Sequence, residues 1–377
     1  MTQKRCKQVI PSDVLFDILL FLPAKSLVRF KTVCKVWYSY ITSSYFIKKQ
    51  LDGYHQKLVL SSSDSFQLVD YKGSQVEAMQ LDFPLEDKDG LKDISSCNGL
   101  LCITLKDGKI VLWNPSTREF KQVQLPRDRG DFRYTFGGFG YDNSHDDYKI
   151  VALGHGRQIL LGTTVEIFSL RNNSWKQMPN LPWYIMFLAT PQPGILVRGD
   201  HQSRNRTLYW QVDYVQKYEP IIGRYSYHKD DHIKAFLCLD LMKEEFCTLT
   251  MPDDICSKAS KFELGNFGGC LSIYKYSDEG YADIWVHELK EVKKWTELIT
   301  IPPMKDLLPE MFAPICIMNN GEVLLNLKEE NKLCLFNPED KALRAFEIQT
   351  LLPFDRVIMH TETLVSPNAI IDGEDRR

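Results

Sequence analysis

The sequence predicts a two-part protein of α plus all-β class, with a small helical N-terminal domain and a large β domain behind it. The first observation is a dense apolar segment, Val14 to Leu22, between two prolines. The second is a change after Leu51, where helical spacing of apolar residues gives way to short β-rich runs separated by turns. The third is one hairpin pattern that recurs six times, which predicts a β-propeller of six blades.

Residues 1–52 are predicted to fold into three short helices, a trihelical unit. The first is indicated by apolar residues at i, i+3, i+4 and i+7: Leu15, Ile18, Leu19 and Leu22. Ser12 is expected to cap it. Pro23 disfavours helical conformation at the residue before it and can begin a second helix. Apolar residues at i, i+4 and i+8 predict the third: Val33, Trp37 and Ile41.

The first helix has more apolar surface than so short a domain can cover. Asp17 is the only polar residue between Val14 and Leu22, and a helix that is apolar all round must be buried on every side. We therefore expect a partner to cover part of it. A membrane anchor or signal peptide is disfavoured because Asp17 and Pro23 interrupt the run. A helical hairpin packed on the rest of the chain remains an alternative.

Charge is unevenly distributed along the 377 residues. Residues 1–52 carry nine Lys and Arg against three Asp and Glu, or +6, whereas the whole chain carries −3, so the remainder carries −9. A basic domain could bind an acidic protein or nucleic acid. The excess of apolar surface favours a protein as the partner. The acidic remainder of the chain has no stripe of basic and aromatic residues of the kind that binds nucleic acid.

Residues 10–37 resemble the F-box, the motif that docks substrate receptors onto the SKP adaptor of cullin–RING ubiquitin ligases. The resemblance rests on the spacing of the leucines, the Leu-Pro break at 22–23 and the closing R-F-K-x-V-C-K-x-W at 29–37. It implies an acidic SKP-type adaptor as partner and, through it, a cullin. It also implies a set of adaptor-binding residues: Pro11, Leu15, Ile18, Leu19, Leu22, Pro23, Leu27, Phe30 and Val33. Trp37 matches the F-box pattern as well, but the alternative for this residue is a place in the domain's own hydrophobic core.

The repeat in residues 53–366 places a turn residue before a large apolar residue. The turn residues are Asp70, Asn114, Ser169, Asp240, His287 and Asn337, each followed six residues later, or eight in the fifth unit, by Val76, Phe120, Trp175, Phe246, Trp295 or Leu343. A β-rich run precedes each turn, and a proline follows most units, which predicts a hairpin whose second strand stops at the proline. A pair of β-sandwiches remains the alternative architecture.

Ring closure is predicted from the end of the chain. The run from Arg356 to Val365 is expected to pair with the first strand after Leu51, which would remove open sheet edges. Within the hairpins, Asp107-Gly108 is a strong turn signal. Residues 367–377 are expected to form a flexible tail.

The β region resembles the F-box-associated interaction domain of plant F-box proteins. The matching phrases lie at 95–103, 112–120, 139–151, 165–178, 208–213 and 282–298. S-locus F-box proteins and F-box/kelch-repeat proteins are relatives within this resemblance, although regular kelch glycine pairs are missing. The resemblance implies that the propeller binds a target protein for ubiquitination and degradation, with self-incompatibility as one of the roles known in the family.

No motif indicates catalysis, a metal or a cofactor. The glycine-rich FGGFGYD at 136–142 lacks the Gly-Lys-Ser/Thr ending of a phosphate loop, and we expect a tight turn there. DNSHDDYK at 142–149 is expected to be a surface turn, and the pair His228 and His232 a solvated loop. The ten cysteines lack zinc-ligand spacing. Reduced thiols favour the cytoplasm or nucleus.

The leading hypothesis is therefore a non-catalytic substrate receptor of an SCF-type ligase that binds neither nucleic acid nor membrane. The sequence does not indicate which protein is the target or which residues bind it. The long unit between Ser169 and Asp240 is our candidate for target contact. The rival hypotheses are an F-box protein that acts outside a ligase and a propeller enzyme with ligands converging on the central channel.

Overall fold

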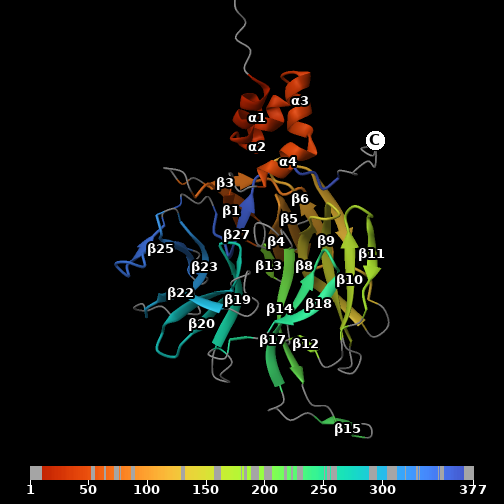
Figure 1. The fold of residues 1–377 in the computed structure, drawn as a ribbon, viewed down its shortest axis with the longest axis vertical. Coiled ribbons are helices and arrows are strands. Elements are labelled where there is room, and N and C mark those ends of the chain that lie inside the picture. The colour runs from red at the N-terminus through yellow and green to blue at the C-terminus, as the bar shows by residue number, and fades with distance from the viewer. Residues whose placement is uncertain are drawn as a thin grey trace, which may run out of the picture.

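A helical head lies on one face of a β-propeller (Figure 1). The structure is a computed structural model, and it describes residues 11–368 except for the following short gaps: 52–55, 63–64, 72–75, 77, 86–89, 129–131, 157–162, 180, 182–184, 188–194, 199–205, 216–218, 222–223, 227–231, 250, 253–254, 256–260, 288–294, 304–311, 319, 328–329, 331, 347 and 349–351. Part of the predicted tail, residues 369–377, lies outside the described residues. The same holds for His228, whereas His232 is the first residue of strand β17 (His232–Asp240) and not part of the expected loop.

The head has four helices: α1 (Ser12–Leu20), α2 (Ala24–Phe30), α3 (Lys35–Thr42) and α4 (Ser44–Gln50). The three predicted helices are present, but Pro11 rather than Ser12 is the N-cap of α1, and Pro23 is the N-cap of α2. The fourth helix was not predicted. Its start is marked by Ser43, whose hydroxyl accepts a hydrogen bond from the Phe46 amide.

The rest of the described chain forms seven sheets, of which six have four or five strands and confirm the six-bladed propeller, while the seventh is a small two-stranded hairpin. In strand order, blade 1 contains β27 (Arg356–Thr361), β1 (Gln56–Ser61), β2 (Phe66–Val69) and β3 (Ala78–Leu81). Blade 2 contains β4 (Leu91–Cys97), β5 (Leu100–Leu105), β6 (Lys109–Trp113) and β7 (Phe120–Gln124). Blade 3 contains β8 (Phe132–Asp142), β9 (Asp147–Gly156), β10 (Thr163–Ser169) and β11 (Ser174–Gln177).

Blade 4 is irregular, because β12 (Ile185–Phe187) and β13 (Ile195–Arg198) both pair with β14 (Arg206–Val215), followed by β17 (His232–Asp240) and β18 (Glu245–Leu249). A separate hairpin of β15 (Glu219–Ile221) and β16 (Arg224–Ser226) lies between β14 and β17 in sequence. Blade 5 contains β19 (Lys261–Phe267), β20 (Cys270–Tyr276), β21 (Ala282–His287) and β22 (Trp295–Ile301). Blade 6 contains β23 (Phe312–Ile317), β24 (Val323–Leu327), β25 (Lys332–Phe336) and β26 (Leu343–Ala345).

Ring closure occurs as predicted. Strand β27 pairs antiparallel with β1, with Gln56 opposite Thr361 and Ser61 opposite Arg356. The last strand of the chain therefore shares a sheet with the first three strands of the propeller. This pairing ties the end of the chain to its beginning, so that blade 1 is complete only when both have folded.

The six repeat units are the turns between the third and fourth strands of the six blades. In several of them the first turn residue accepts backbone N–H groups two or three residues further on, as Asn114 does from Ser116 and Asp240 from Met242. Four units then place a residue with positive φ four positions after the first: Arg118, Asn173, Glu244 and Lys341. The repeat in the sequence thus encodes a repeated turn geometry.

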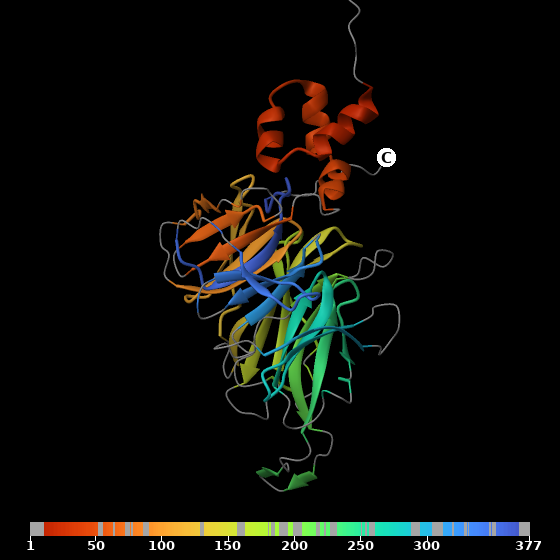
Figure 2. The ribbon, with the colours of Figure 1, turned by 90° about the vertical axis from the view of Figure 1, so that its left-hand side faces the viewer.

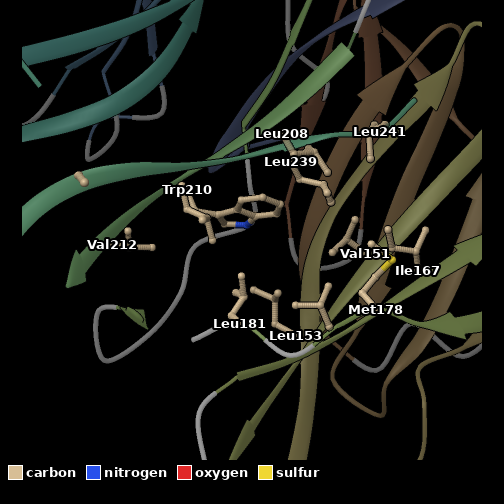
Figure 3. Packing of buried hydrophobic residues seen from close by; sticks show 13 residues of the cluster. Val151, Leu153, Ile167, Met178, Leu181, Leu208, Trp210, Val212, Leu239 and Leu241 are labelled. Atoms are coloured by element: carbon tan, nitrogen blue, oxygen red, sulfur yellow. The ribbon is translucent and has the colours of Figure 1, made fainter. Parts of the chain in front are cut away.

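The hydrophobic core lies between adjacent blades. Figure 3 shows one part of it, where residues of β9 and β10 face residues of β14 and β17 around Trp210. The Trp210 indole donates to the Gly137 carbonyl at 2.8 Å. The prediction of a tight turn at 136–142 is wrong, because this segment belongs to strand β8, which has a bulge near Gly138. A Cβ at Gly137 would lie 2.8 Å from Leu153, so the glycine permits close packing.

Antiparallel pairing assigns the connections to two faces. Turns that join the first to the second and the third to the fourth strand of a blade lie on one face, here called the near face. Turns that join the second to the third strand, and the links between blades, lie on the opposite or far face. The head lies against the near face, because Lys48 forms a 3.0 Å ion pair with Asp146 in the β8–β9 turn. Hairpin β15–β16 lies at the end of the molecule opposite the head (Figures 1 and 2).

Candidate adaptor-docking surface

The head has its own hydrophobic core, to which all four helices contribute. Its fully buried members are Leu19, Ala24, Leu27, Ile41 and Phe46, and they are joined by Leu364 from the segment after β27. Around these lie partly buried residues, including Trp37, which packs against Phe30 with ring centroids 5.2 Å apart. Trp37 is thus a core residue of the head, the alternative that the sequence had left open.

The other side of α1 is exposed and apolar. Val14, Ile18 and Phe21 recur at i, i+4 and i+7, so they share one helix face, and their side chains are 44%, 47% and 63% exposed. A helix that is apolar all round is therefore divided between two environments. Its Leu15, Leu19 and Leu22 side faces the head core, and its Val14, Ile18 and Phe21 side faces outward.

Exposed apolar side chains are concentrated in the head. Thirteen large hydrophobic residues are exposed in the part of the chain that the structure describes: eight in the head, Val14, Ile18, Phe21, Val28, Val33, Val36, Tyr38 and Tyr45, and five in the propeller, Met79, Phe120, Tyr281, Leu298 and Ile317. Scattered single residues of this kind are normal on a surface. A concentration in one small domain marks an interaction surface.

The nine residues predicted to bind the adaptor divide into three groups. Pro11, Ile18, Pro23 and Val33 are exposed. Leu15, Leu22 and Phe30 are half-buried and pack against the head core. Leu19 and Leu27 are fully buried inside it, where they support the surface from below. Adaptor binding by all nine stays a prediction.

Six exposed large hydrophobic residues of the head were missing from the predicted set: Val14, Phe21, Val28, Val36, Tyr38 and Tyr45. For Val14 and Phe21 a signal existed, because their spacing around Ile18 defines a second apolar face of the first helix. Val28 and Val36 had no comparable signal, since short helices leave the inward direction undetermined until their neighbours are placed.

The head is attached to the propeller by polar contacts as well as by Leu364. The Gln50 side-chain oxygen accepts a hydrogen bond from the Leu364 amide at 3.1 Å. The Asn114 amide donates to the carbonyls of Thr363 and Val365 at 3.0 and 2.7 Å, which holds the same segment from the propeller side. Gly99 lies under it, and a Cβ there would fall 1.8 Å from the Thr363 hydroxyl oxygen. Residues 362–366 therefore connect head and propeller.

The polar motifs singled out in the propeller serve structure. His360 is buried in β27, and burial, followed by the charge of Lys57, lowers its pKa to about 4. His287 is buried at the end of β21, with its ring 5.0 Å from that of Trp295. Across the described residues, no group of three or more His, Cys, Asp and Glu is arranged to hold a metal ion. No helix described by the structure is long and apolar enough to cross a membrane.

The expected surface turn at 142–149 is only partly a surface feature. Residues 143–146 form the turn, but Asp142, Asp147 and Lys149 are buried. The Lys149 ammonium lies 3.0 Å from Asp142 and 2.9 Å from Glu244, which belongs to the β17–β18 turn of the next blade. Burial alone would raise the pKa of Asp142, but hydrogen bonds from Ser144, Lys149 and His145 outweigh it and hold that pKa well below its usual value. The group ties blade 3 to blade 4.

The described chain thus consists of a four-helix head with an outward apolar face and a closed six-bladed propeller to which the head is fixed. The F-box domain family matches residues 9–49, and the F-box associated beta propeller domain family matches residues 54–362. The chain belongs to the F-box proteins that carry this propeller. Such proteins act in general as substrate-recognition subunits of SCF ubiquitin ligases, with an SKP-type adaptor as partner.

Relatives in Arabidopsis thaliana match along most of their length. The F-box/kelch-repeat protein At3g23880 is 28% identical, with 95% of this chain and 96% of that protein covered. The F-box protein CPR1 is 27% identical, with 90% and 84% covered. Among solved structures, a virginiamycin B lyase from Staphylococcus aureus aligns at 10% identity and a TM-score of 0.37, over 78% of this chain and 85% of that one, a similarity too weak to bear on function.

Proposed function

We propose that this chain is the substrate-recognition subunit of an SCF-type ligase, in which the head binds an SKP-type adaptor and the propeller holds a target protein. The observation that carries the proposal is the concentration of exposed apolar residues on the head, above all Val14, Ile18 and Phe21 on one face of α1. Burying their side chains against a partner would favour binding by about 25 cal/mol of free energy for each Å² of apolar area removed from water. The adaptor would in turn link the chain to a cullin.

The proposal is tested by co-purification of the full chain with an SKP adaptor and a cullin. The variants Ile18→Asp and Phe21→Asp add a charge to the proposed contact while leaving the buried residues of the head unchanged. We expect each to weaken adaptor binding at least tenfold. Leu298→Asp is the matched control, because Leu298 is 44% exposed and lies in blade 5 of the propeller. We expect it to bind the adaptor normally.

Two results would contradict the proposal. Undiminished adaptor binding by the Ile18→Asp, Phe21→Asp double variant, with a wild-type circular dichroism spectrum, would show that the head uses another surface. Adaptor binding without recovery of a cullin would favour an F-box protein that acts outside a ligase. Leu19→Asp is unsuitable for this test, since a charge in the core of the head would unfold it.

The far face is our proposed site for the target. The near face is partly covered by the head and by residues 362–366, whereas the far face receives the links between blades. The candidate unit between Ser169 and Asp240 contains hairpin β15–β16, which lies at the far end (Figure 2). Connections on a rigid scaffold are the usual place for binding residues.

The target itself can be sought by proximity labelling in cells treated with a proteasome inhibitor. A chain that lacks residues 216–231, with strands β14 and β17 joined by a short glycine linker, is the comparison. We expect the labelled target to be lost from this variant while the adaptor is retained. Retention of the target would place its binding site elsewhere on the propeller. The eight cysteines that the structure describes are free thiols, which supports the cytoplasm or nucleus as the place for this experiment.

A further inference from the structure

Two cysteines of blade 4 lie directly opposite each other on neighbouring strands. Cys238 of β17 is paired with Cys247 of β18, the strand at the edge of the sheet. Their sulfur atoms are 2.6 Å apart. Residues opposite each other in an antiparallel pair have Cα atoms about 4.5–5.5 Å apart, within the range of about 4.4–6.8 Å that a disulfide spans. A bond between them therefore requires no rearrangement of the backbone.

The two thiols differ in accessibility. Cys247 is exposed, whereas Cys238 is buried between the strands. The Cys238 thiol donates toward the Cys247 carbonyl at 3.0 Å as well as lying against the Cys247 sulfur. An oxidant in solution thus reaches Cys247 first, and Cys238 is in place to react with whatever forms there.

The more accessible thiol, that of Cys247, is also the more acidic of the two. The pKa of Cys247 is lowered to about 7, chiefly by the hydrogen bond from Cys238 and further by the charge of Lys243. Burial and the charge of Asp240 raise this pKa but are outweighed. The same hydrogen bond and burial raise the pKa of Cys238. A thiolate is the reactive form of cysteine, so a substantial fraction of Cys247 is reactive at neutral pH.

We propose that Cys247 and Cys238 form a reversible thiol–disulfide pair that responds to hydrogen peroxide. The Cys247 thiolate attacks one peroxide oxygen, the O–O bond breaks, and the hydroxide released takes up a proton to become water. This leaves Cys247 as a sulfenic acid. The Cys238 sulfur then attacks the Cys247 sulfur, the S–O bond breaks, and the departing hydroxide takes the Cys238 proton. Two thiols and one peroxide thus give one disulfide and two waters.

The bond would fix the edge strand of blade 4 to β17, the strand that follows hairpin β15–β16 in the chain. The peroxide effect would therefore fall on the blade that carries our candidate for target contact. A dithiol reductant of the thioredoxin class would restore the two thiols by exchange. The inference itself rests on the strand pairing and holds whether or not the chain acts in a ligase.

The test uses the reduced full chain, treated with hydrogen peroxide at pH 7, quenched by alkylation and digested for mass spectrometry. We expect a peptide pair linked through Cys238 and Cys247, lost after dithiothreitol. In Cys238→Ser we expect a sulfenic acid at Cys247 that dimedone traps. Cys34→Ser is the matched control, because Cys34 is also exposed but lies in the head. It should form the linked peptides as the wild type does.

Three outcomes would overturn the proposal. One is a wild-type chain in which Cys247 accumulates sulfinic acid without linking to Cys238. The second is a Cys247 that is oxidised no faster than Cys34 at pH 7. The third is a rate of Cys247 oxidation that does not rise between pH 6 and 8, since the thiolate fraction of a group with a pKa near 7 increases over that range.

Discussion

Lys149 shows how one buried charge can link two blades. Its ammonium contacts Asp142 in its own blade and, in the next blade, Glu244 and the Leu241 carbonyl, the last at 2.6 Å. Burial alone would lower the pKa of Lys149, but the hydrogen bonds to Glu244 and Asp142 outweigh it and raise that pKa. The lysine is thus held charged, and the two acids depend on it.

The first prediction concerns this lysine. Lys149→Met should destabilise the chain by about 3–5 kcal/mol, because it leaves the buried Asp142 carboxylate without its cation. The free energy of unfolding in urea measures the effect. Lys332→Met is the control: Lys332 pairs with Glu330 on the surface, and its loss should cause no measurable change in the free energy of unfolding. Equal effects of the two substitutions would show that burial of the Lys149 pair contributes nothing.

The second prediction concerns His360 and pH. Its pKa of about 4 in the folded chain lies below the value of about 6.5 expected when it is unfolded. Between these values the unfolded chain binds more protons, so stability falls as the pH is lowered from 6.5 to 4. The loss is of the order of 3 kcal/mol. His360→Gln should flatten the dependence of the unfolding free energy on pH in this window. An unchanged slope would contradict the assignment.

At the scale of elements, the geometry of the turn in each repeat unit explains why the repeat can be recognised in the sequence. A side-chain acceptor begins the turn, as Asn337 does by accepting the Glu339 amide at 2.9 Å. A residue with positive φ precedes the last strand, and none of the four residues found there is glycine. Each of them is held in a conformation that costs an L-residue about 1–2 kcal/mol.

The third prediction follows from this strain. Lys341 has φ of 55° and lies in the turn before β26. Lys341→Gly should raise the free energy of unfolding by about 0.5–1 kcal/mol, because glycine adopts this conformation without steric cost. Lys341→Val should lower it, since branched residues fit positive φ poorly. Thermal or urea unfolding of the three proteins gives the order, and a glycine variant less stable than the valine variant would refute the explanation.

At the scale of the whole molecule, the end of the chain joins both domains. Strand β27 completes blade 1, and the residues that follow insert Leu364 into the core of the head. Head and propeller are therefore joined by a segment that contributes to both. Under the proposed function, this segment would set the position of a target on the propeller relative to an adaptor on the head.

The fourth prediction tests this coupling. Leu364→Ala should destabilise the head by about 2–5 kcal/mol, as for other leucines removed from a core. Hydrogen exchange would show faster exchange of amides in α1, α2 and α4. Val365→Ala, at a half-buried position one residue on, serves as the comparison and should leave the head protected. Unchanged exchange of the head in Leu364→Ala would mean that it folds independently of the end of the chain.

The sequence by itself determined the two domains, the six blades, the closing strand and the surplus of apolar surface on the first helix. These rest on local signals, namely turn residues, strand-forming runs and helical spacing, which act over a few residues. The family matches follow the same order along the chain, an F-box and then a propeller. The fourth helix was missed because its apolar residues, around Phe46, are too few to show a period.

The tertiary structure decided which residues face where. Leu19 and Leu27 lie inside the head, in a core that includes Leu364 from the far end of the chain, while Phe21 lies outside. Strand pairing likewise buries Lys149 and brings Cys238 against Cys247. Burial and contact depend on which distant segments pack together, and the spacing of residues along one segment carries no record of its neighbours.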